Sequence, residues 1–404
     1  MKVLPTFCIL FSALVMQGQE PFGGGGQFCT NDNRFTEIDY FEDSQIDSIL
    51  NVEYAQAFDF QDSLNILYLD IYMPRLSEDS MDKRPFVMQM FGGGFVVGNK
   101  IMMRPDCMEL ARKGFVCASI NYRLGDVPNA IYRAQQDAHA AMRWIVANAD
   151  TYGIDTNWLF VGGQSAGAIV AGYLQYSSQD DWNTTRPGLV DTLGLINTSG
   201  NNLTSSFTLK GIIMNWGFVQ IDHVAPSEMI PMIAFHGEDD PIVPIDSIDL
   251  GSGGSRWLHN QLVANNVCSD LTVAPGAGHS PPVLFAPGFR MPKTSCFFKS
   301  LFCNSCSSVY EEQNVSADCS SSTTAVNIDY SIEKVFVYPN PFKDKIQITG
   351  LTGNEYFILS NISGQKVWEG NNMDLLNMAS LNKGIYFLSL VENSTHQVVK
   401  LIKQ

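Results

Sequence analysis

Short apolar runs alternate with helical patterns between residues 64 and 274. The run 85–91 is apolar except for Gln89, as expected for a strand that is buried on both faces of a sheet. In the segment 130–149, apolar residues recur at spacings of three and four and form one helix face. Strands that alternate with helices predict an α/β fold with a mostly parallel central sheet, covered by helices on both faces. We expect further strands at 64–72, 115–120, 158–161, 209–214, 232–235 and 271–274, and further helices at 103–113, 166–175 and 257–264.

The composition excludes two kinds of protein. Of the 404 residues, 45% are hydrophobic and 16% are charged, which is too apolar and too weakly charged for a disordered chain. The chain has 25 basic and 41 acidic residues, a formal net charge of -16. A protein this acidic has no general electrostatic attraction to phosphate backbones, so nucleic acid is not an expected partner. No cofactor is expected either.

The N-terminus has the pattern of a secretory signal peptide. Lys2 is followed by the apolar run 3–16, and small or polar residues come after it. The run is too short to span a bilayer, which takes about 20 residues. We expect cleavage near Gly18, so residues 1–18 form the signal. A buried N-terminal strand or helix is the less favoured alternative.

The chain has nine cysteines, and removal of the signal would remove Cys8. An even number in an exported chain favours disulfides, although the sequence leaves the pairing open. Cys303 and Cys306 have the spacing of a zinc or redox pair, but no second close pair accompanies them, so no metal is expected. The eight remaining cysteines are Cys29, Cys107, Cys117, Cys268, Cys296, Cys303, Cys306 and Cys319.

The composition changes along the chain and suggests domain boundaries. Residues 19–304 contain the α/β pattern, with a polar insertion at 176–208 that we expect to lie over the edge of the sheet. Residues 305–333 are rich in Ser and Thr and suggest a linker. Residues 334–404 contain short apolar runs separated by glycines, which predict a small all-β sandwich.

A candidate nucleophile lies between a strand and a helix. In Gly163-Gln164-Ser165-Ala166-Gly167, the serine falls on a tight turn that small neighbours permit and that exposes its hydroxyl. The N-terminus of the following helix favours developing negative charge. A purely structural serine is the alternative.

A serine nucleophile needs a base, and His279 is the best candidate among the six histidines. It follows a strand and has Gly276 and Gly278 before it, which suits a loop that approaches another site. His223 is a distant second candidate. The other four histidines fall on predicted helices, at a strand end or in the C-terminal domain: His139, His236, His259 and His396.

The base needs an acid, and carboxylates follow the strand at 232–235. We predict that Asp240 is the acid, with Asp239 or Glu238 as alternatives. Ser165, Asp240 and His279 then occur in the order nucleophile, acid, base, which is the order in α/β-hydrolases.

Backbone donors for an oxyanion are expected from the glycine run that follows strand 85–91. We predict that the N–H groups of Gly93, Gly94 and Ala166 are these donors, each contributing roughly 2.7–4 kcal/mol to transition-state stabilisation. A phosphate-binding loop is a poor alternative, because no Gly-Lys-Ser/Thr follows the glycines.

Together these motifs resemble a known family. Residues 55–300 resemble secreted α/β-hydrolases of the carboxylesterase and feruloyl-esterase type, related to hormone-sensitive lipase. The resemblance favours Asp240 as the acid and implies a structural pair of Asp137 with Arg123. One departure is Phe91, where the family usually has a histidine that orders the oxyanion loop. The motifs that carry the resemblance are 91–95, 121–124, 163–167, 236–244 and 278–279.

Residues 335–404 resemble the C-terminal sorting domain of the type IX secretion system. The motifs are Tyr338-Pro339-Asn340-Pro341, the segment 361–365, the segment 381–386 and the terminal 400–403. This resemblance implies a location outside the cell or on its surface, with the outer-membrane secretion machinery as a partner. A carbohydrate-binding sandwich is the alternative by shape.

The sequence therefore predicts a secreted serine esterase that acts through an acyl-enzyme, on an ester substrate such as an acylated polysaccharide or a polyester. A prolyl-oligopeptidase-type peptidase uses the same fold and triad, but too few residues precede the strands for its usual extra domain. A non-catalytic binding protein with a hydrolase-like fold is the third alternative.

Overall fold

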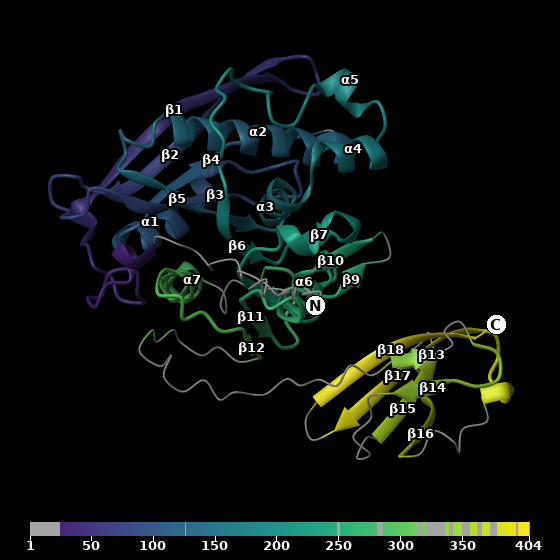
Figure 1. Cartoon of the computed structure of the whole chain (residues 1–404). Coiled ribbons are helices and arrows are strands. Elements are labelled where there is room, and N and C mark those ends of the chain that lie inside the picture. Colours follow the sequence, from purple (N-terminus) through teal and green to yellow (C-terminus); the bar gives the residue numbers. More distant parts are fainter. Residues whose placement is uncertain are drawn as a thin grey trace, which may run out of the picture. The chain divides into compact units, whose positions relative to one another are not determined.

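The computed structural model consists of two compact units, Met1–Thr323 and Thr324–Gln404, which we describe separately (Figure 1). The predicted signal peptide and Cys8 lie outside the described residues. The residues described are 25–125, 127–248, 251–280, 286–312, 317, 319, 336–338, 342–349, 356–361, 366–371, 378–392 and 395–403.

The first unit is built on a nine-stranded sheet. Its strands, in spatial order, are β1 (Ile46–Phe58), β2 (Leu64–Pro74), β4 (Val116–Ile120), β3 (Arg84–Met90), β5 (Ile154–Gln164), β6 (Leu209–Asn215), β8 (Met232–Gly237), β11 (Ser269–Ala274) and β12 (Val309–Glu311). All neighbours from β4 to β12 are parallel, whereas β2 is antiparallel to both β1 and β4. The predicted α/β fold with a mostly parallel sheet is confirmed. A separate three-stranded sheet contains β7 (Phe218–Gln220), β10 (Ser252–Gly254) and β9 (Ser247–Ile248).

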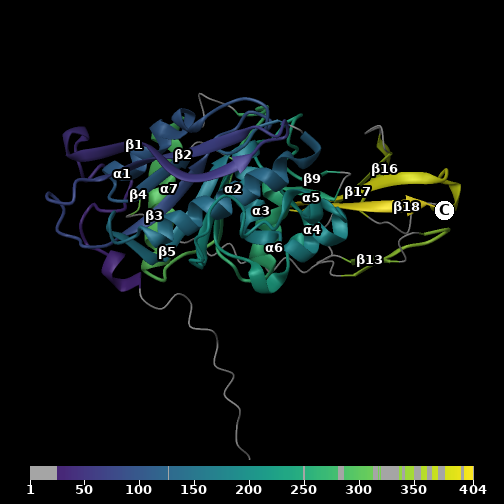
Figure 2. The ribbon, with the colours of Figure 1, turned by 90° about the horizontal axis from the view of Figure 1, so that it is seen from above.

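Two pairs of helices cover the sheet. The helices α1 (Arg104–Arg112) and α7 (Pro287–Phe302) pack together, and α2 (Val127–Ala147) packs against α3 (Ala166–Tyr176). The two pairs lie on opposite sides of the sheet (Figure 1), and α2 and α3 lie side by side in both views (Figure 2). The helix α6 (Ser255–Ala264) packs near β8 and β11. Among the described residues, no helix is both long enough and apolar enough to cross a lipid bilayer.

The helix α7 was not expected from the sequence. Its buried residues include Arg290, Lys293 and Thr294, so the buried face has no clear hydrophobic period. Aromatic rings nevertheless anchor its second half in the core: Phe298 stacks on Phe160 of β5 with ring centroids 3.8 Å apart, and Phe302 meets Trp158 edge-on at 4.9 Å. Tertiary packing therefore decides the position of a helix that local patterning does not reveal.

The insertion at 176–208 covers the edge of the sheet, as expected. It contains α4 (Gln179–Thr185) and α5 (Leu189–Leu193) and then runs along the edge strand β1. There, the backbone N–H of Gln56 donates to the carbonyl of Gly200 at 2.9 Å. The insertion thus occupies backbone groups that an exposed edge strand would offer to another chain.

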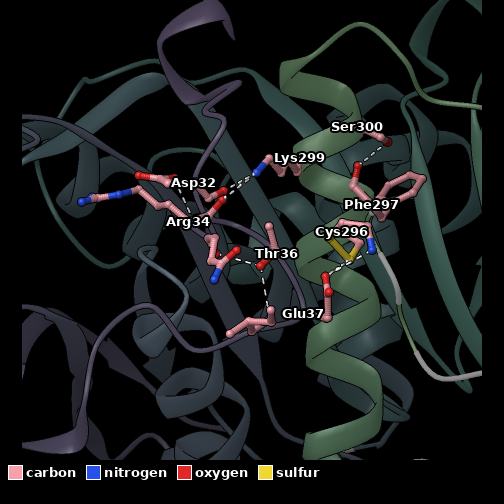
Figure 3. Close-up of a disulfide and its surroundings, with 11 residues drawn as sticks. Asp32, Arg34, Thr36, Glu37, Cys296, Phe297, Lys299 and Ser300 are labelled. Atoms are coloured by element: carbon pink, nitrogen blue, oxygen red, sulfur yellow. Dashed lines mark hydrogen bonds between the residues drawn. A yellow bond between two sulfur atoms is a disulfide. The ribbon is translucent and has the colours of Figure 1, made fainter. Parts of the chain in front are cut away.

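Three disulfides hold the ends of the first unit to α7 and β11. They join Cys29 to Cys303, Cys268 to Cys306 and Cys296 to Cys319. In Figure 3, Cys296 on α7 lies beside the N-terminal segment that carries Asp32 and Glu37, and Lys299 donates to the carbonyls of Asp32 and Arg34. The backbone N–H of Cys319 also donates to Glu37, at 3.1 Å.

These links change the expected start of the linker. Residue 304 does not end the first unit, because β12 pairs with β11, and Cys306 and Cys319 are bonded into the unit. The Ser- and Thr-rich composition of this segment conceals the pairing, since disulfides and one short strand hold it without a hydrophobic pattern. A linker that begins at 305 is therefore corrected to one that begins later.

Two of the eight expected disulfide cysteines remain free thiols. Cys107 on α1 and Cys117 on β4 are fully buried. Burial raises the pKa of the Cys107 thiol well above its usual value, and the nearby Cys117 adds to this effect. Because both side chains are fully buried, reagents cannot reach them, and both should be chemically inert in the folded protein.

We predict that iodoacetamide leaves the native protein unmodified at Cys107 and Cys117. Denaturation without a reductant should add labels at these two positions, and reduction should expose the six disulfide cysteines, as measured by mass spectrometry of the peptides. Labelling of the native protein would contradict their burial. No label after denaturation would show instead that the two sulfurs are bonded.

The second unit contains the short strands that the sequence predicts. A four-stranded sheet has the order β16 (Lys366–Gly370), β15 (Tyr356–Asn361), β17 (Gly384–Glu392) and β18 (Thr395–Lys403), and a two-stranded sheet pairs β13 (Phe336–Tyr338) with β14 (Gln347–Thr349). Ile348 of β14 packs against a core formed by Phe357, Leu388 and Leu401 of the larger sheet. The two sheets thus share one small apolar core, as in a sandwich.

Candidate active site

Ser165 lies on the sharp turn between β5 and α3. Its φ of 51° and ψ of -117° are unusual for a residue with a side chain, and strain of this kind is common at functional turns. The flanking glycines are required by space, because a Cβ at Gly163 or Gly167 would lie closer than 3.0 Å to the carbonyl oxygen of Met90. The turn therefore fits closely beside the end of β3.

The structure brings His279 and Asp240 to Ser165. The Nε2 atom of His279 lies 2.9 Å from Ser165 Oγ, and its Nδ1 atom lies 2.7 Å from Asp240 Oδ2. Ser165 follows β5, Asp240 follows β8 and His279 follows β11, so all three lie at the carboxyl ends of parallel strands. A chain of hydrogen bonds from a carboxylate through an imidazole to a hydroxyl can remove the proton from that hydroxyl.

Asp240 remains ionised although its side chain is buried. Burial acts to raise its pKa, but hydrogen bonds from His236, the Val243 backbone, His279 and the Ile242 backbone outweigh burial and hold the pKa well below its ordinary value. The two backbone N–H groups both donate to Oδ1 at 2.9 Å, which leaves Oδ2 to face His279.

Backbone pairing joins the loop of the acid to the loop of the base. The β8–β11 pair continues past the strands, since the N–H of Asp239 donates to the carbonyl of Ala277 at 2.9 Å. A Cβ at Gly237 would collide with the backbone of Ala277 and Gly278, so only glycine allows this approach. Of the three carboxylates left open by the sequence, Asp240 contacts His279, whereas Glu238 lies 3.7 Å from Arg256.

The glycine loop lies next to Ser165. A Cβ placed on Gly92 would lie 3.2 Å from Ser165 Cβ, and Gly93 has a φ of 125° that disfavours any side chain. The space beside the Cα of Gly94 is open, because a Cβ added there would meet no heavy atom within 4 Å. Ala166 is the first residue of α3. The role of the Gly93, Gly94 and Ala166 N–H groups as oxyanion donors stays a prediction.

Phe91, the departure from the family pattern, is packed beneath the glycine loop. Its ring stacks on Tyr122 with centroids 4.3 Å apart, and the Tyr122 hydroxyl donates to the Phe91 carbonyl at 2.7 Å. Gly98 passes so close to the ring that a Cβ there would collide with it. Apolar packing and one hydrogen bond therefore hold the start of the loop.

Two other histidines of the first unit contact serine hydroxyls and do not contact Ser165. The Nδ1 atom of His223 lies 2.7 Å from Ser177 Oγ, and that of His259 lies 2.9 Å from Ser269 Oγ. Burial lowers the pKa of both His139 and His259 to about 4, so both rings are neutral at pH 7. The expected structural pair is also present, with Arg123 Nη2 2.7 Å from Asp137 Oδ1.

We predict that the buried neutral histidines make the protein less stable in mild acid. Between pH 6.5 and 4, the unfolded histidines bind a proton that His139 and His259 in the folded state do not, so stability falls as pH falls. Each ring accounts for about 3 kcal/mol across this window. The His139→Leu variant should show a shallower loss of urea midpoint from pH 7 to pH 5. An unchanged slope would contradict the assignment.

A buried ion pair supports the residue before the nucleophile. Arg290 of α7 makes two hydrogen bonds to Asp106 of α1, at 2.8 and 2.9 Å, and both side chains are almost fully buried. The amide of Gln164 donates to the same carboxylate at 3.2 Å. The pair was not expected from the sequence, because a charged residue in a helix pattern gives no sign of a partner 184 positions away.

We predict that the Arg290→Met variant lowers the free energy of unfolding by about 3–5 kcal/mol, because it leaves the Asp106 carboxylate buried without its cation. The double variant Asp106→Leu/Arg290→Met should lose less stability than Arg290→Met alone, as measured by urea unfolding. Equal or additive losses would show that the two side chains do not act as a pair.

One group among the described residues has three potential metal-ligand atoms close together: Glu37, Cys296 and Cys319. The two sulfurs are bonded to each other, so neither is available as a thiolate ligand. This cluster is therefore part of the disulfide contact in Figure 3 and does not suggest a metal site.

Comparison with family models gives two matches. Residues 69–229 match BD-FAE, a family of hormone-sensitive-lipase-like esterases, and this range includes the glycine loop and Ser165. The matched part of the first unit is therefore similar to these esterases. Asp240 and His279 lie beyond the range matched by the BD-FAE model, so their place beside Ser165 rests on the geometry above.

Residues 336–404 match the secretion system C-terminal sorting domain. This match indicates type IX secretion and a location outside the cell or at its surface. It also agrees with the short strands and shared core of the second unit.

Several curated proteins are similar to part of the chain. Fumonisin B1 esterase of Sphingopyxis macrogoltabida is 31% identical over 159 residues, which are 35% of this chain and 29% of that protein. Esterase E4 of Myzus persicae is 30% identical over 129 residues, which are 30% of this chain and 23% of that protein. The chain thus spans less than a third of the length of these two relatives. Among solved structures, a truncated carbohydrate esterase from gut microbiota is 20% identical with a TM-score of 0.49, covering 66% of this chain and all of that one.

Proposed function

We propose that this protein is a secreted serine esterase that hydrolyses carboxylic esters through an acyl-enzyme. The observation that carries the proposal is the chain of hydrogen bonds from Asp240 through His279 to Ser165. Ser165 and the glycine loop beside it lie within the range that matches an esterase family. The family match favours an ester over the peptide bond that a prolyl-oligopeptidase-type enzyme would cleave.

In the first half of the reaction, Ser165 Oγ attacks the ester carbonyl carbon while His279 Nε2 takes the hydroxyl proton. Asp240 stabilises the imidazolium that forms and holds the ring so that Nε2 faces the serine. The negative charge on the carbonyl oxygen would be met by the N–H groups of Gly93, Gly94 and Ala166, the last at the N-terminus of α3. His279 then gives its proton to the leaving alcohol, and Ser165 keeps the acyl group.

The second half repeats the proton transfers with water. His279 accepts a proton from a water molecule as the water oxygen attacks the acyl-enzyme carbonyl. The tetrahedral intermediate then collapses, and the bond between its carbon and Ser165 Oγ breaks. Oγ regains its proton from His279, and the carboxylic acid leaves. Every proton transfer in both halves of the reaction thus passes through His279.

The loops around Ser165 suggest part of the substrate preference. Val96 and Val97 follow the glycine loop, Ile242 follows the acid, and their exposed fractions are 54%, 63% and 69%. Exposed apolar side chains in the loops that follow the glycine run and the acid favour an apolar group on the acyl or the alcohol part of the ester. Export places the enzyme where it meets esters of larger molecules, so we propose an acylated polysaccharide or a polyester as the substrate.

Export would use both ends of the chain. Residues 1–18 would direct the chain across the inner membrane as a signal peptide, and the C-terminal domain would engage the outer-membrane secretion machinery. The sulfur pairs of the first unit suit the oxidising conditions outside the cytoplasm.

We predict that the Ser165→Ala variant loses hydrolysis of a short p-nitrophenyl ester, by on the order of 10⁴-fold or more in kcat, with unchanged folding. A fluorophosphonate probe should label the native enzyme at Ser165 and leave the variant unlabelled.

Ser177→Ala is the matched control for this experiment. Ser177 also contacts a histidine, since its Oγ lies 2.7 Å from His223 Nδ1. This variant should keep both hydrolysis and labelling. Retained activity in Ser165→Ala, or a larger loss in Ser177→Ala, would overturn the proposal.

A further inference from the structure

A second buried histidine contacts the carboxylate of Asp240. His236 lies in β8, and its Nε2 atom is 3.3 Å from Asp240 Oδ2, the same oxygen that faces His279. The side chains of His236 and Asp240 are both fully buried. The acid therefore lies between two imidazole rings, of which only His279 reaches Ser165.

The surroundings of His236 fix its protonation pattern. Nε2 lies 2.8 Å from the carbonyl oxygen of Val243, and a carbonyl can only accept, so this nitrogen carries the proton. Nδ1 lies 2.7 Å from Ser255 Oγ, the first residue of α6, and accepts from that hydroxyl when the ring is neutral. The ring is thus held from both sides and presents one N–H to Val243 and Asp240.

These contacts close a ring of interactions around the acid. Val243 donates its N–H to Asp240 Oδ1 at 2.9 Å and accepts from His236 with its carbonyl. His236 in turn shares its N–H with Asp240 Oδ2. Rotation of the carboxylate would break contacts at both of its oxygens, so the loop 237–243 and the side chain are locked together.

We propose that His236 is a positioning residue of the esterase, which acts through Asp240 by holding the carboxylate in the orientation that His279 requires. This inference rests on the proposed function. His236 does not touch Ser165 or the glycine loop in the described structure, so it is not a catalytic residue. Its contribution is preorganisation: the carboxylate already faces the ring when the imidazolium forms, and no rearrangement is needed.

Two substitutions test this role, and they differ in whether the side chain at position 236 can donate a hydrogen bond to Asp240. His236→Phe keeps a ring of similar size and removes the donor, so kcat should fall about 10–100-fold, the effect of losing a hydrogen bond to a charged group. KM should change by less than about threefold, because the ring is buried away from the substrate. His236→Gln places an amide N–H near the position of Nε2 and should recover most of the lost kcat.

His259→Gln is the control for the general cost of changing a buried histidine. His259 is also buried and also places Nδ1 beside a serine hydroxyl, but that serine is Ser269 on β11. Among the described residues, no ion pair joins its ring to a carboxylate, and burial is the one cause of its lowered pKa. This variant should retain kcat, whatever its effect on the urea midpoint. Circular dichroism and urea unfolding of all variants would show that each protein is folded under the assay conditions.

A measurement without substrate tests the orientation directly. The proton between His279 Nδ1 and Asp240 should give a far-downfield resonance in the proton NMR spectrum of the native enzyme. His236→Phe should broaden or remove it through faster exchange, whereas His236→Gln and His259→Gln should keep it.

The proposal is overturned if folded His236→Phe keeps the native kcat and resonance, or if His259→Gln loses as much of both. Failure of the esterase proposal looks different, because it would leave the native protein without hydrolysis and Ser165 without label. The resonance would still report on His236 and Asp240 in that case.

Discussion

The site depends on how closely the turn at Ser165 approaches the end of β3. Gly163 and Gly167 leave no room for a Cβ against the carbonyl of Met90, so the chain can pass there only as glycine. The register of the parallel pair aligns Met90 with Gly163, and the glycine loop begins directly after Met90. The same contact that allows the sharp turn therefore places the backbone of the loop beside the serine. Nucleophile and candidate oxyanion donors are positioned by one strand pairing.

A second strand pairing positions the acid and the base. The register of β8 with β11 aligns Gly237 with Ala274, and backbone hydrogen bonds extend the pairing into both loops. Backbone pairing thus places Asp240 and His279 side by side, independently of the hydrogen bond between their side chains. The side chains of the proposed triad come from three loops, but two strand registers and the β5–β6–β8 pairing between them determine the geometry. A parallel sheet suits such a site because its strands all end at one edge.

Much of this could be predicted from the sequence, because strand ends carry local signals. The turn at Ser165, the glycines before His279 and the acidic loop at Asp240 all follow apolar runs, and the expected alternation of strands and helices is confirmed. Other features depend on partners that are distant in sequence. The helix α7 buries Arg290 against Asp106, and β12 pairs in a Ser-rich segment. Which cysteines form disulfides depends on which of them meet in the folded chain, so the sequence does not reveal that Cys107 and Cys117 stay free. His236 shows the same limit: its place at a strand end is visible, but its contact with the acid is not.

The segment 236–244 can be understood as one physical unit built around a buried charge. A carboxylate removed from water would tend to take up a proton, so its ionised form needs donors in the surrounding loop. Gly237 permits the close approach to the loop of the base, His236 supplies one N–H, and Val243 binds the acid through its N–H while its carbonyl holds His236. Each position has a separate reason for its residue type. The motif therefore reflects the electrostatic cost of burying an acid, and loss of a hydrogen bond to Asp240 would destabilise the ionised carboxylate that His279 needs.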